Sequence, residues 1–171
     1  ELLLGCQHYP RNCKIQAKCC GLWCVCRLCH DSQDMALAHA INRKETERIM
    51  CMFCLTEQPV SNQCISCNET FARYFCPICV FYDNTPDKDV YHCSDCGICR
   101  VGKGLGKDNF HCSKCNACVS IESRDSHNCI AKSLDANCPI CSVYLFTSTD
   151  PVVFMRCGHT MHSHCRFILF H

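Results

Sequence analysis

The stretch YHCSDCGICRVG at residues 91–102 recurs as FHCSKCNACVSI at residues 110–121. Each copy contains the pattern His-Cys-x2-Cys-x2-Cys, and corresponding positions lie nineteen residues apart. Histidine and cysteine are preferred zinc ligands, and two thiols separated by two residues fit one tetrahedral ion. Because the pattern is repeated, it predicts a row of zinc sites along the chain.

Adjacent ligands within each copy are expected to serve different ions. His92 and Cys93 are neighbours, and successive side chains of an extended segment point to opposite faces. With a Cys-x2-Cys pair before the repeat and a His/Cys pair after it, twelve ligands are present for three ions. We expect the three ligand sets to be Cys76, Cys79, Cys93 and Cys96; His92, Cys99, Cys112 and Cys115; and His111, Cys118, His127 and Cys129.

The composition favours zinc over disulfides. The chain has 171 residues with 24 Cys and 10 His. A disulfide framework does not need histidines beside its cysteines, whereas zinc sites use both. We therefore expect a reducing compartment, cytoplasmic and/or nuclear. The expected fold is small and zinc-stabilised, irregular and β-rich, with few short helices.

Charge and hydropathy argue against two classes of partner. The formal net charge is +1, and each zinc site with three thiolates adds a further negative charge. The folded chain is therefore expected to lack the basic face that nucleic-acid binding needs. No apolar run is long enough to span a membrane, so no membrane partner is expected. The first residue is Glu1 and not Met, and we expect a fragment of a longer protein.

The first third of the chain carries another twelve candidate ligands for three ions. Two Cys-x2-Cys pairs nine residues apart indicate one ribbon-like zinc site. How the other eight candidate ligands pair stays open. The simplest division joins Cys6, His8, Cys26 and Cys29, but it puts adjacent Cys19 and Cys20 on one ion, against the alternation used above. The candidates are Cys6, His8, Cys19, Cys20, Cys26, Cys29, His30, His39, Cys51, Cys54, Cys64 and Cys67, with Cys13 and Cys24 as surplus thiols.

Residues 34–50 are predicted to form a helix. Leu37, Ile41 and Ile49 give an imperfect apolar stripe, and Asp34 can cap the first turn. His39 falls on this predicted helix. A lone helical histidine is usually not a ligand, but the ligand count favours it here.

Three motif blocks resemble known zinc fingers. The block with Cys-x-His-Tyr at residues 6–9 and the Cys-Cys doublet resembles the CHY zinc finger. Residues 74–129 resemble the CTCHY zinc finger, and residues from 138 onward resemble a RING-H2 finger. Together they resemble the RING and CHY zinc-finger E3 ubiquitin ligases. The division expected from these motifs is a CHY finger at 1–69, a CTCHY finger at 70–133 and an incomplete RING-H2 finger at 134–171.

In the cross-brace implied by this resemblance, alternate ligand pairs share an ion. Cys138, Cys141, His162 and Cys165 then form a complete zinc site, whereas Cys157 and His159 supply half of another. We therefore expect seven complete Zn²⁺ sites and an eighth that is half-formed. The segment 151–158 and the segment after Cys165 are expected to be mobile because the second ion would lack two ligands.

The resemblance also implies a function. A RING finger of this kind acts as a transferase without covalent chemistry: it positions a ubiquitin-charged conjugating enzyme for transfer of ubiquitin to lysines of a protein substrate, commonly for degradation. Ile140 would contact the conjugating enzyme, and the CHY and CTCHY modules would recruit substrate. Because the last ligand pair is missing, this fragment is expected to be a poor ligase. The alternative is a non-catalytic, zinc-dependent scaffold for protein interactions.

Overall fold

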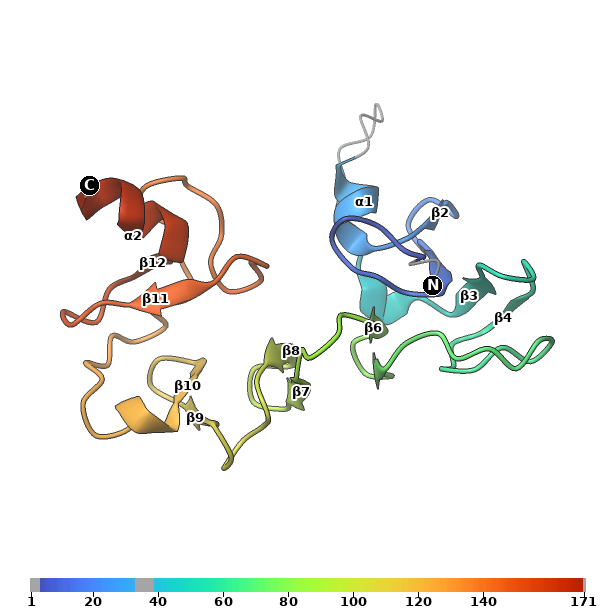
Figure 1. Cartoon of the computed structure of the whole chain (residues 1–171). Helices are drawn as coiled ribbons and strands as arrows, with labels where there is room; N and C mark the ends of the chain where they lie inside the picture. The colour runs from blue at the N-terminus through green and yellow to red at the C-terminus, as the bar shows by residue number, and fades with distance from the viewer. Residues whose placement is uncertain (1–3, 33–38, 171) are drawn as a thin grey trace. The chain divides into compact units, whose positions relative to one another are not determined.

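The computed structural model describes residues 4–32 and 39–170. The chain divides into two compact units, residues 1–88 and 89–171. Short strands dominate the described residues of both units, and their α-helices are short (Figure 1). The expected β-rich, zinc-stabilised fold is confirmed. The three-module division drawn from the motifs stays a prediction.

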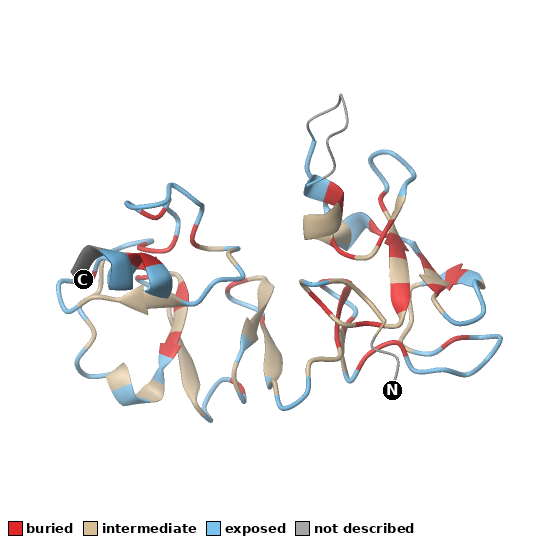
Figure 2. Ribbon diagram, turned by 45° about the horizontal axis from the view of Figure 1, so that its top comes forward, coloured by how far each residue is buried: buried red, intermediate tan, exposed pale blue. Residues whose placement is uncertain are grey.

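A four-stranded antiparallel sheet organises the first unit, with strand order β2-β1-β3-β4. Ile15 pairs with Ile49 across two of its strands, and both side chains are buried. Phe71 and Tyr82 complete this core, and buried residues gather along the strands (Figure 2). The strands are β1 (Cys13–Gln16), β2 (Trp23–Cys24), β3 (Arg48–Cys51) and β4 (Glu57–Pro59).

The helix predicted for residues 34–50 is wrong over residues 39–50. Residues 34–38 of that prediction lie outside the residues that the structure describes. In its place are a single 3₁₀ turn, η1 (Arg43–Glu45), and strand β3. Pairing of β3 with β1 places Ile49 in the core, a gain that a short solvent-facing helix could not match. The α-helix of this unit is α1 (Arg27–Asp31), whose first turn is capped by the Cys26 thiol.

A hairpin of β5 (Tyr74–Cys76) and β6 (Phe81–Asp83) follows in the first unit. Asp83 is buried, and its carboxylate accepts hydrogen bonds from Lys88 Nζ at 2.8 Å and from Thr85 N at 2.9 Å. Burial alone would raise the pKa of Asp83, but the hydrogen bonds from Lys88 and Thr85 more than offset it and lower the pKa. The carboxylate thus stays ionised inside the unit.

The second unit consists of three successive hairpins. Its last hairpin packs with α2 around Leu145, Met161 and Cys165, and the same core reaches Val119 of the middle hairpin. Two segments were expected to be mobile, 151–158 and the one after Cys165. The strand β11 lies within the first, and the helix α2 continues past Cys165 to Phe170, so both contain regular structure. The elements are β7 (Val90–Cys93), β8 (Ile98–Val101), β9 (Asn109–Cys112), β10 (Ala117–Ser120), η2 (Ile121–Ser123), β11 (Val152–Phe154), β12 (Thr160–His162) and α2 (Ser163–Phe170).

Six of the Cys-x2-Cys turns share one backbone conformation. In these turns the residue after the second cysteine is left-handed: Leu55, Asn68, Val80, Gly97, Asn116 and Ser142. Glycine and asparagine accept this conformation readily, whereas it costs a leucine or valine about 1–2 kcal/mol. The amide of the second cysteine can also donate to the first sulfur, as Cys96 N does to Cys93 Sγ at 3.4 Å. These turns therefore aim two sulfurs at one point.

Within residues 4–32 and 39–170, none of the helices combines the length and the apolar character needed to cross a membrane.

Candidate metal centres

Cysteine and histidine side chains converge in groups of four. In each group the candidate ligand atoms lie within 4.8 Å of one another. The groups include Cys6, His8, Cys26 and Cys29; Cys19, Cys20, His30 and His39; and Cys51, Cys54, Cys64 and Cys67 in the first unit, and Cys93, Cys96, His111 and Cys118 in the second.

Two further groups follow from individual contacts in the second unit. Cys112 Sγ lies 3.6 Å from Cys129 Sγ and 3.4 Å from His127 Nε2, and Cys115 interacts with Cys112 and Cys129. Near the C-terminal helix, Cys141 Sγ lies 3.2 Å from His162 Nδ1. Cys165 interacts with Cys138 and Cys141, so these four residues also form a set.

The spacing of the ligand atoms fits zinc. A tetrahedral ion with zinc–sulfur bonds of about 2.3 Å has sulfur–sulfur edges of about 3.8 Å and slightly shorter sulfur–nitrogen edges. The Cys96–Cys118 sulfurs are 3.6 Å apart, the Cys51–Cys67 sulfurs 3.7 Å, and Cys96 Sγ lies 3.4 Å from His111 Nδ1. The cysteines are free rather than disulfide-bonded. Closed sets of four ligands are typical of structural Zn²⁺, and the chain carries several such sites.

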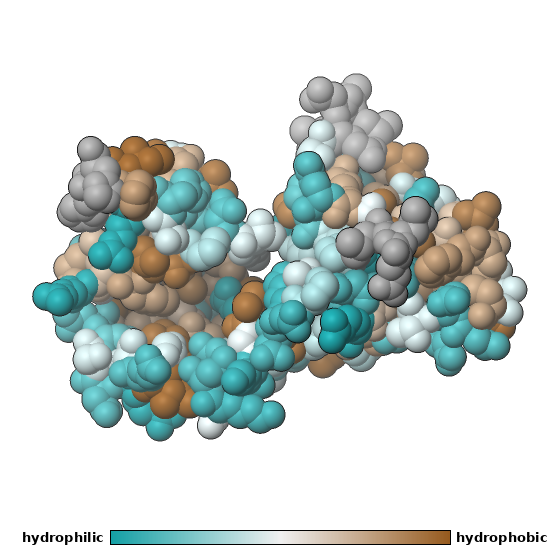
Figure 3. All heavy atoms as spheres, in the orientation of Figure 1, coloured by the Kyte–Doolittle hydropathy of each residue, from teal (hydrophilic) through white to brown (hydrophobic). Residues whose placement is uncertain are grey.

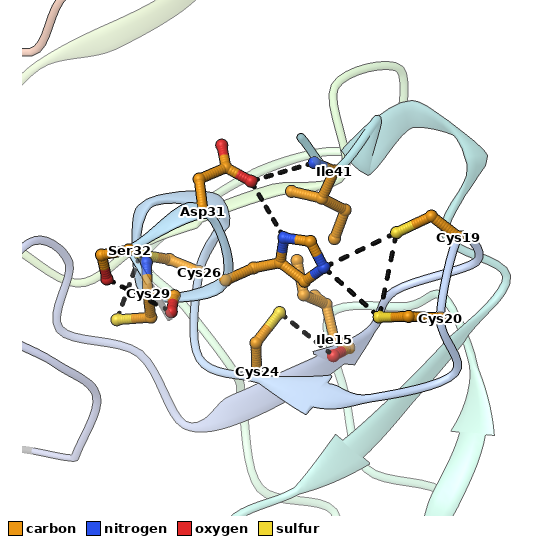
Figure 4. A network of polar contacts seen from close by, with 10 residues as sticks. Ile15, Cys19, Cys20, Cys24, Cys26, Cys29, Asp31, Ser32 and Ile41 are labelled. Carbon is orange, nitrogen blue, oxygen red and sulfur yellow. Dashed lines mark hydrogen bonds and ion pairs between the residues drawn. The ribbon is translucent and has the colours of Figure 1, made fainter. Parts of the chain in front are cut away.

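The structure decides the pairing that was left open in the first unit. It selects the simpler division, with adjacent Cys19 and Cys20 in one group. These two residues lie in the turn between β1 and β2, so the alternation of an extended strand does not apply to them. Figure 4 shows both thiols facing the same imidazole: His30 Nε2 lies 3.6 Å from Cys19 Sγ and 3.4 Å from Cys20 Sγ. His39 lies beside His30, with ring centroids 5.0 Å apart.

The ligand sets expected for the repeat are wrong, although the alternation behind them holds. His92 and Cys93 do belong to different groups, as do His111 and Cys112. Within the second unit His92 lies with Cys99, and the corrected sets are Cys93, Cys96, His111 and Cys118; and Cys112, Cys115, His127 and Cys129.

Hairpin formation is the reason for this correction. Each copy of the repeat folds back on itself, so that His92 lies directly opposite Cys99, and His111 opposite Cys118. Residues opposite one another in an antiparallel pair point to the same face, and each His/Cys pair therefore goes to one ion. The Cys-x2-Cys turn at the hairpin tip is left for the next ion.

Within a group, the thiols differ in how readily they ionise. Burial opposes ionisation of Cys112, but the Cys115 amide and His127 outweigh it and lower the pKa of Cys112 to about 6. Burial and the neighbouring thiolates raise the pKa of Cys115 to about 12. The pKa of Cys138 is likewise lowered to about 6, because hydrogen bonds from backbone amides outweigh the effect of burial. Repulsion between neighbouring thiolates keeps the last thiols of each group protonated. A divalent cation would offset this repulsion.

Several histidines have a partner that fixes their tautomer. Asp31 Oδ1 lies 2.9 Å from His30 Nδ1 and also accepts from Ile41 N, leaving His30 Nε2 for the metal (Figure 4). Ser148 Oγ lies 2.9 Å from His162 Nε2, and the Ser123 carbonyl lies 3.2 Å from His127 Nδ1. Sequence reasoning missed these partners because they follow no fixed spacing from the ligands. Only the Asp31 carboxylate, adjacent to His30, could have been suspected.

The remaining site candidates lie in the C-terminal segment. Cys157 Sγ lies 3.4 Å from His159 Nδ1, so the expected half-site pair is together. His164 Nε2 lies 3.2 Å from Cys165 Sγ, and its ring stacks on His162 with centroids 5.5 Å apart. Ile140, between Cys138 and Cys141, is 40% exposed. The surplus thiols Cys13 and Cys24 are instead buried in the core of the first unit.

Comparison with known proteins identifies the first finger type. Residues 6–74 match the CHY zinc finger family. A RING finger protein of Schizosaccharomyces pombe is 45% identical over 163 residues, 95% of this chain and 38% of the relative. A BRUTUS-like zinc finger protein of Arabidopsis thaliana is 48% identical over 167 residues, 96% of this chain and 13% of the relative. An E3 ubiquitin-protein ligase of Oryza sativa is 48% identical over 162 residues, 94% of this chain and 61% of the relative.

The chain thus spans only part of each of these relatives, from 13% to 61% of their lengths. The matches cover 94% to 96% of this chain. The match of residues 6–74 to the CHY zinc finger, the relatives and the sets of zinc ligands lead to one conclusion: nearly the whole chain is similar to RING and CHY zinc-finger proteins, among them proteins named E3 ubiquitin-protein ligases.

Proposed function

We propose that this chain is the zinc-finger part of a RING-type E3 ubiquitin ligase. Its C-terminal finger binds a ubiquitin-charged conjugating enzyme, and its CHY and CTCHY fingers recruit the protein substrate. Names of relatives such as the rice E3 ubiquitin-protein ligase support the general activity. The dense array of free thiols fits a reducing compartment, so we place the protein in the cytoplasm or nucleus.

The observation that carries the proposal is the exposed apolar surface around one zinc group. Ile140 is 40% exposed, Val143 52% and Tyr144 40%, although Leu145 beside them is buried. On the helix α2, Phe167 and Ile168 are also exposed, and apolar side chains are visible there in Figure 3. Exposed apolar side chains on a fixed frame are typical of a protein-binding surface.

The contribution to the reaction is positioning. No side chain of the finger needs to react, because a substrate lysine attacks the thioester that the conjugating enzyme carries. The tetrad of Cys138, Cys141, His162 and Cys165 holds the Ile140 turn rigid, so that the bound enzyme keeps one orientation. When zinc is bound it supplies this rigidity. It leaves no open position for substrate, because all four ligands come from the protein.

Binding of conjugating enzymes tests the proposal. ¹⁵N-labelled chain is titrated with a panel of ubiquitin-conjugating enzymes, first as wild type and then as Ile140→Ala. We expect the variant to weaken binding by about tenfold or more, as for an interface anchor. The matched control is Ile78→Ala, because Ile78 is 60% exposed in a second Cys-Pro-Ile-Cys turn. Binding to none of the panel, or equal losses in both variants, would favour the non-catalytic scaffold.

Ubiquitin discharge is the second measurement. Cys157 and His159 supply only half of a tetrahedral set, and misplacement of a bound reactant by about 1 Å can cost about a hundredfold in rate. We therefore expect residues 1–171 to bind a conjugating enzyme but to discharge its ubiquitin slowly. Fast discharge that Ile140→Ala does not reduce would contradict the proposed role of this turn.

A further inference from the structure

The two hairpins of the repeat differ at one pair of positions. Tyr91 lies directly opposite Arg100 in the β7–β8 hairpin. Nineteen residues later the corresponding pair is Phe110 and Val119, again directly opposite one another. One hairpin thus presents a polar pair where the other presents an apolar pair.

The polar pair lies against sulfur atoms of the group formed by Cys93, Cys96, His111 and Cys118. The positive charge of Arg100 lies close enough to lower the pKa of Cys96, and the Tyr91 hydroxyl lies near Cys118. Arg100 Nε and Nη2 and the Tyr91 hydroxyl are buried without a hydrogen-bond partner. These buried polar atoms thus lie beside cysteines that become metal-bound thiolates when zinc is present.

The remaining guanidinium nitrogen of Arg100, Nη1, contacts another part of the same unit. It donates to the Phe146 carbonyl at 3.0 Å, and the guanidinium lies 4.6 Å from the centre of the Phe146 ring. Phe146 follows the Cys138–Cys141 turn closely, and its neighbour Leu145 bonds back to Ala136 through its amide. One buried guanidinium thus joins a metal site to the segment beside Ile140.

Charge explains why an arginine is useful there. Three thiolates around a divalent ion leave a net charge of −1, which is costly to bury without a counter-charge. A guanidinium is always protonated and can donate to two acceptors in different directions, which a lysine ammonium on a flexible chain does less well. At the corresponding position of the second hairpin, Val119 cannot supply this charge.

We propose that Arg100 is a positioning residue with two tasks. Its guanidinium balances the thiolates of the Cys93, Cys96 and Cys118 site and slows loss of zinc from it. Its hydrogen bond to Phe146 holds the segment 145–147 and thereby the Ile140 turn. The first task is independent of any ligase activity. The effect on conjugating-enzyme binding rests on the proposed function.

Cadmium substitution separates the sites. In ¹¹³Cd-loaded protein each four-ligand group gives its own resonance, and His111→Ala assigns the resonance of the Arg100 site. We expect Arg100→Gln to shift that resonance alone and to speed metal loss from that site to a chelator by about tenfold, as for other second-layer partners of metal ligands. Amide hydrogen exchange at residues 145–147 should accelerate in the same variant.

Arg100→Lys distinguishes the two tasks. It keeps the charge, so slow metal loss should return, but one ammonium cannot also hold Phe146, and fast exchange at 145–147 should remain. The matched control is Arg124→Gln, because the exposed Arg124 also lies over a phenylalanine ring, Phe110, at 5.0 Å. Tyr91→Phe serves if Arg100→Gln fails to fold: it removes one hydroxyl and should shift the same resonance.

Two outcomes would overturn the inference. One is an unchanged resonance and unchanged metal loss in Arg100→Gln, or in Tyr91→Phe where that variant replaces it. The other is an equal effect from Arg124→Gln. Since both readouts are made without a conjugating enzyme, failure of the proposed ligase function would leave them intact.

Discussion

The cysteines of this chain fall into two classes according to what surrounds each sulfur. Cys24 is buried, its thiol donates to the Ile15 carbonyl at 3.7 Å, and burial raises its pKa to about 12. Cys54 lies on the surface, where the Thr56 hydroxyl and amide lower its pKa to about 6. What separates the two classes is the neighbouring ligand atoms and not burial, since Cys115 is also buried, with its pKa raised to about 12, yet lies in a ligand group. Cysteine spacing identifies the second class.

This difference predicts how zinc content responds to substitution. Cys24→Ala should keep the full zinc content and lose about 1 kcal/mol or somewhat more of stability, because it removes only a buried sulfur. Cys26→Ser, two residues away, should lose about one zinc per chain, because Cys26 belongs to the Cys6, His8 and Cys29 group. Elemental analysis of the purified variants measures both. A full zinc content in Cys26→Ser would contradict the assignment.

Leu55 occupies a position that suits it poorly. Its φ of 62° is left-handed, and its side chain is 67% exposed. Leu55→Asn should therefore raise the free energy of unfolding by about 1 kcal/mol, since asparagine accepts this conformation and little packing is lost. Urea unfolding at saturating zinc is the measurement.

Phe53→Asn is the control for this substitution, because Phe53 is 49% exposed in the same turn and is not among the residues with positive φ. Its effect should stay within about 0.5 kcal/mol. Equal stabilisation by both variants would show that exposed apolar area, and not backbone strain, is responsible.

At the scale of elements, the hairpin is the unit that distributes ligands. Pairing of His111 with Cys118 sends both to one ion, while the turn residues Cys112 and Cys115 serve the next. Neighbouring metal sites are therefore linked through single hairpins. Damage to one ligand should be confined to one ion even where the next residue along the chain binds another.

His111→Ala and Cys112→Ser test this distribution. The first should abolish the cadmium resonance of the Cys93, Cys96 and Cys118 site, and the second should abolish that of the His127 and Cys129 site. Each variant should leave the other resonance present, because a two-stranded hairpin can persist with one site intact. Loss of the same resonance in both variants would place His111 and Cys112 on one ion.

At the scale of the whole molecule, metal replaces part of the apolar core. The first unit has a real but small core around Ile15, Ile49 and Tyr82, and many of its buried residues are cysteines. Small domains bury too little apolar surface to be very stable without help. Structural zinc contributes on the order of 10 kcal/mol per site, which exceeds the net stability of many small domains.

Removal of metal should therefore unfold the chain. We expect seven tightly bound zinc ions per chain, and loss of circular dichroism and of amide dispersion after complete chelation. Elemental analysis and NMR spectra before and after chelator treatment measure the two quantities. A content of three or fewer ions, or a chain that stays folded without metal, would be incompatible with the ligand groups described.

Much of the metal chemistry could be read from the sequence. Ligand identity is local: the spacing in Cys51-x2-Cys54 or His92-Cys93-x2-Cys96 marks each side chain as a ligand candidate before any fold is known. Alternation along an extended chain also separated His92 from Cys93 correctly, since it depends only on backbone geometry. The β-rich, zinc-dependent character followed from the same residues.

Which ligands share an ion was decided only by tertiary structure. Cys99 meets His92 because a hairpin folds between them, and Cys19 and Cys20 share a group because they lie in a turn. The region 39–50 has helix-forming residues, yet pairing with β1 makes part of it a strand. Asp31, Ser148 and Arg100 lie beside metal ligands. Their positions likewise depend on contacts between distant segments or on the orientation of the side chain. Local spacing sets what a side chain can bind, and long-range pairing sets what it meets.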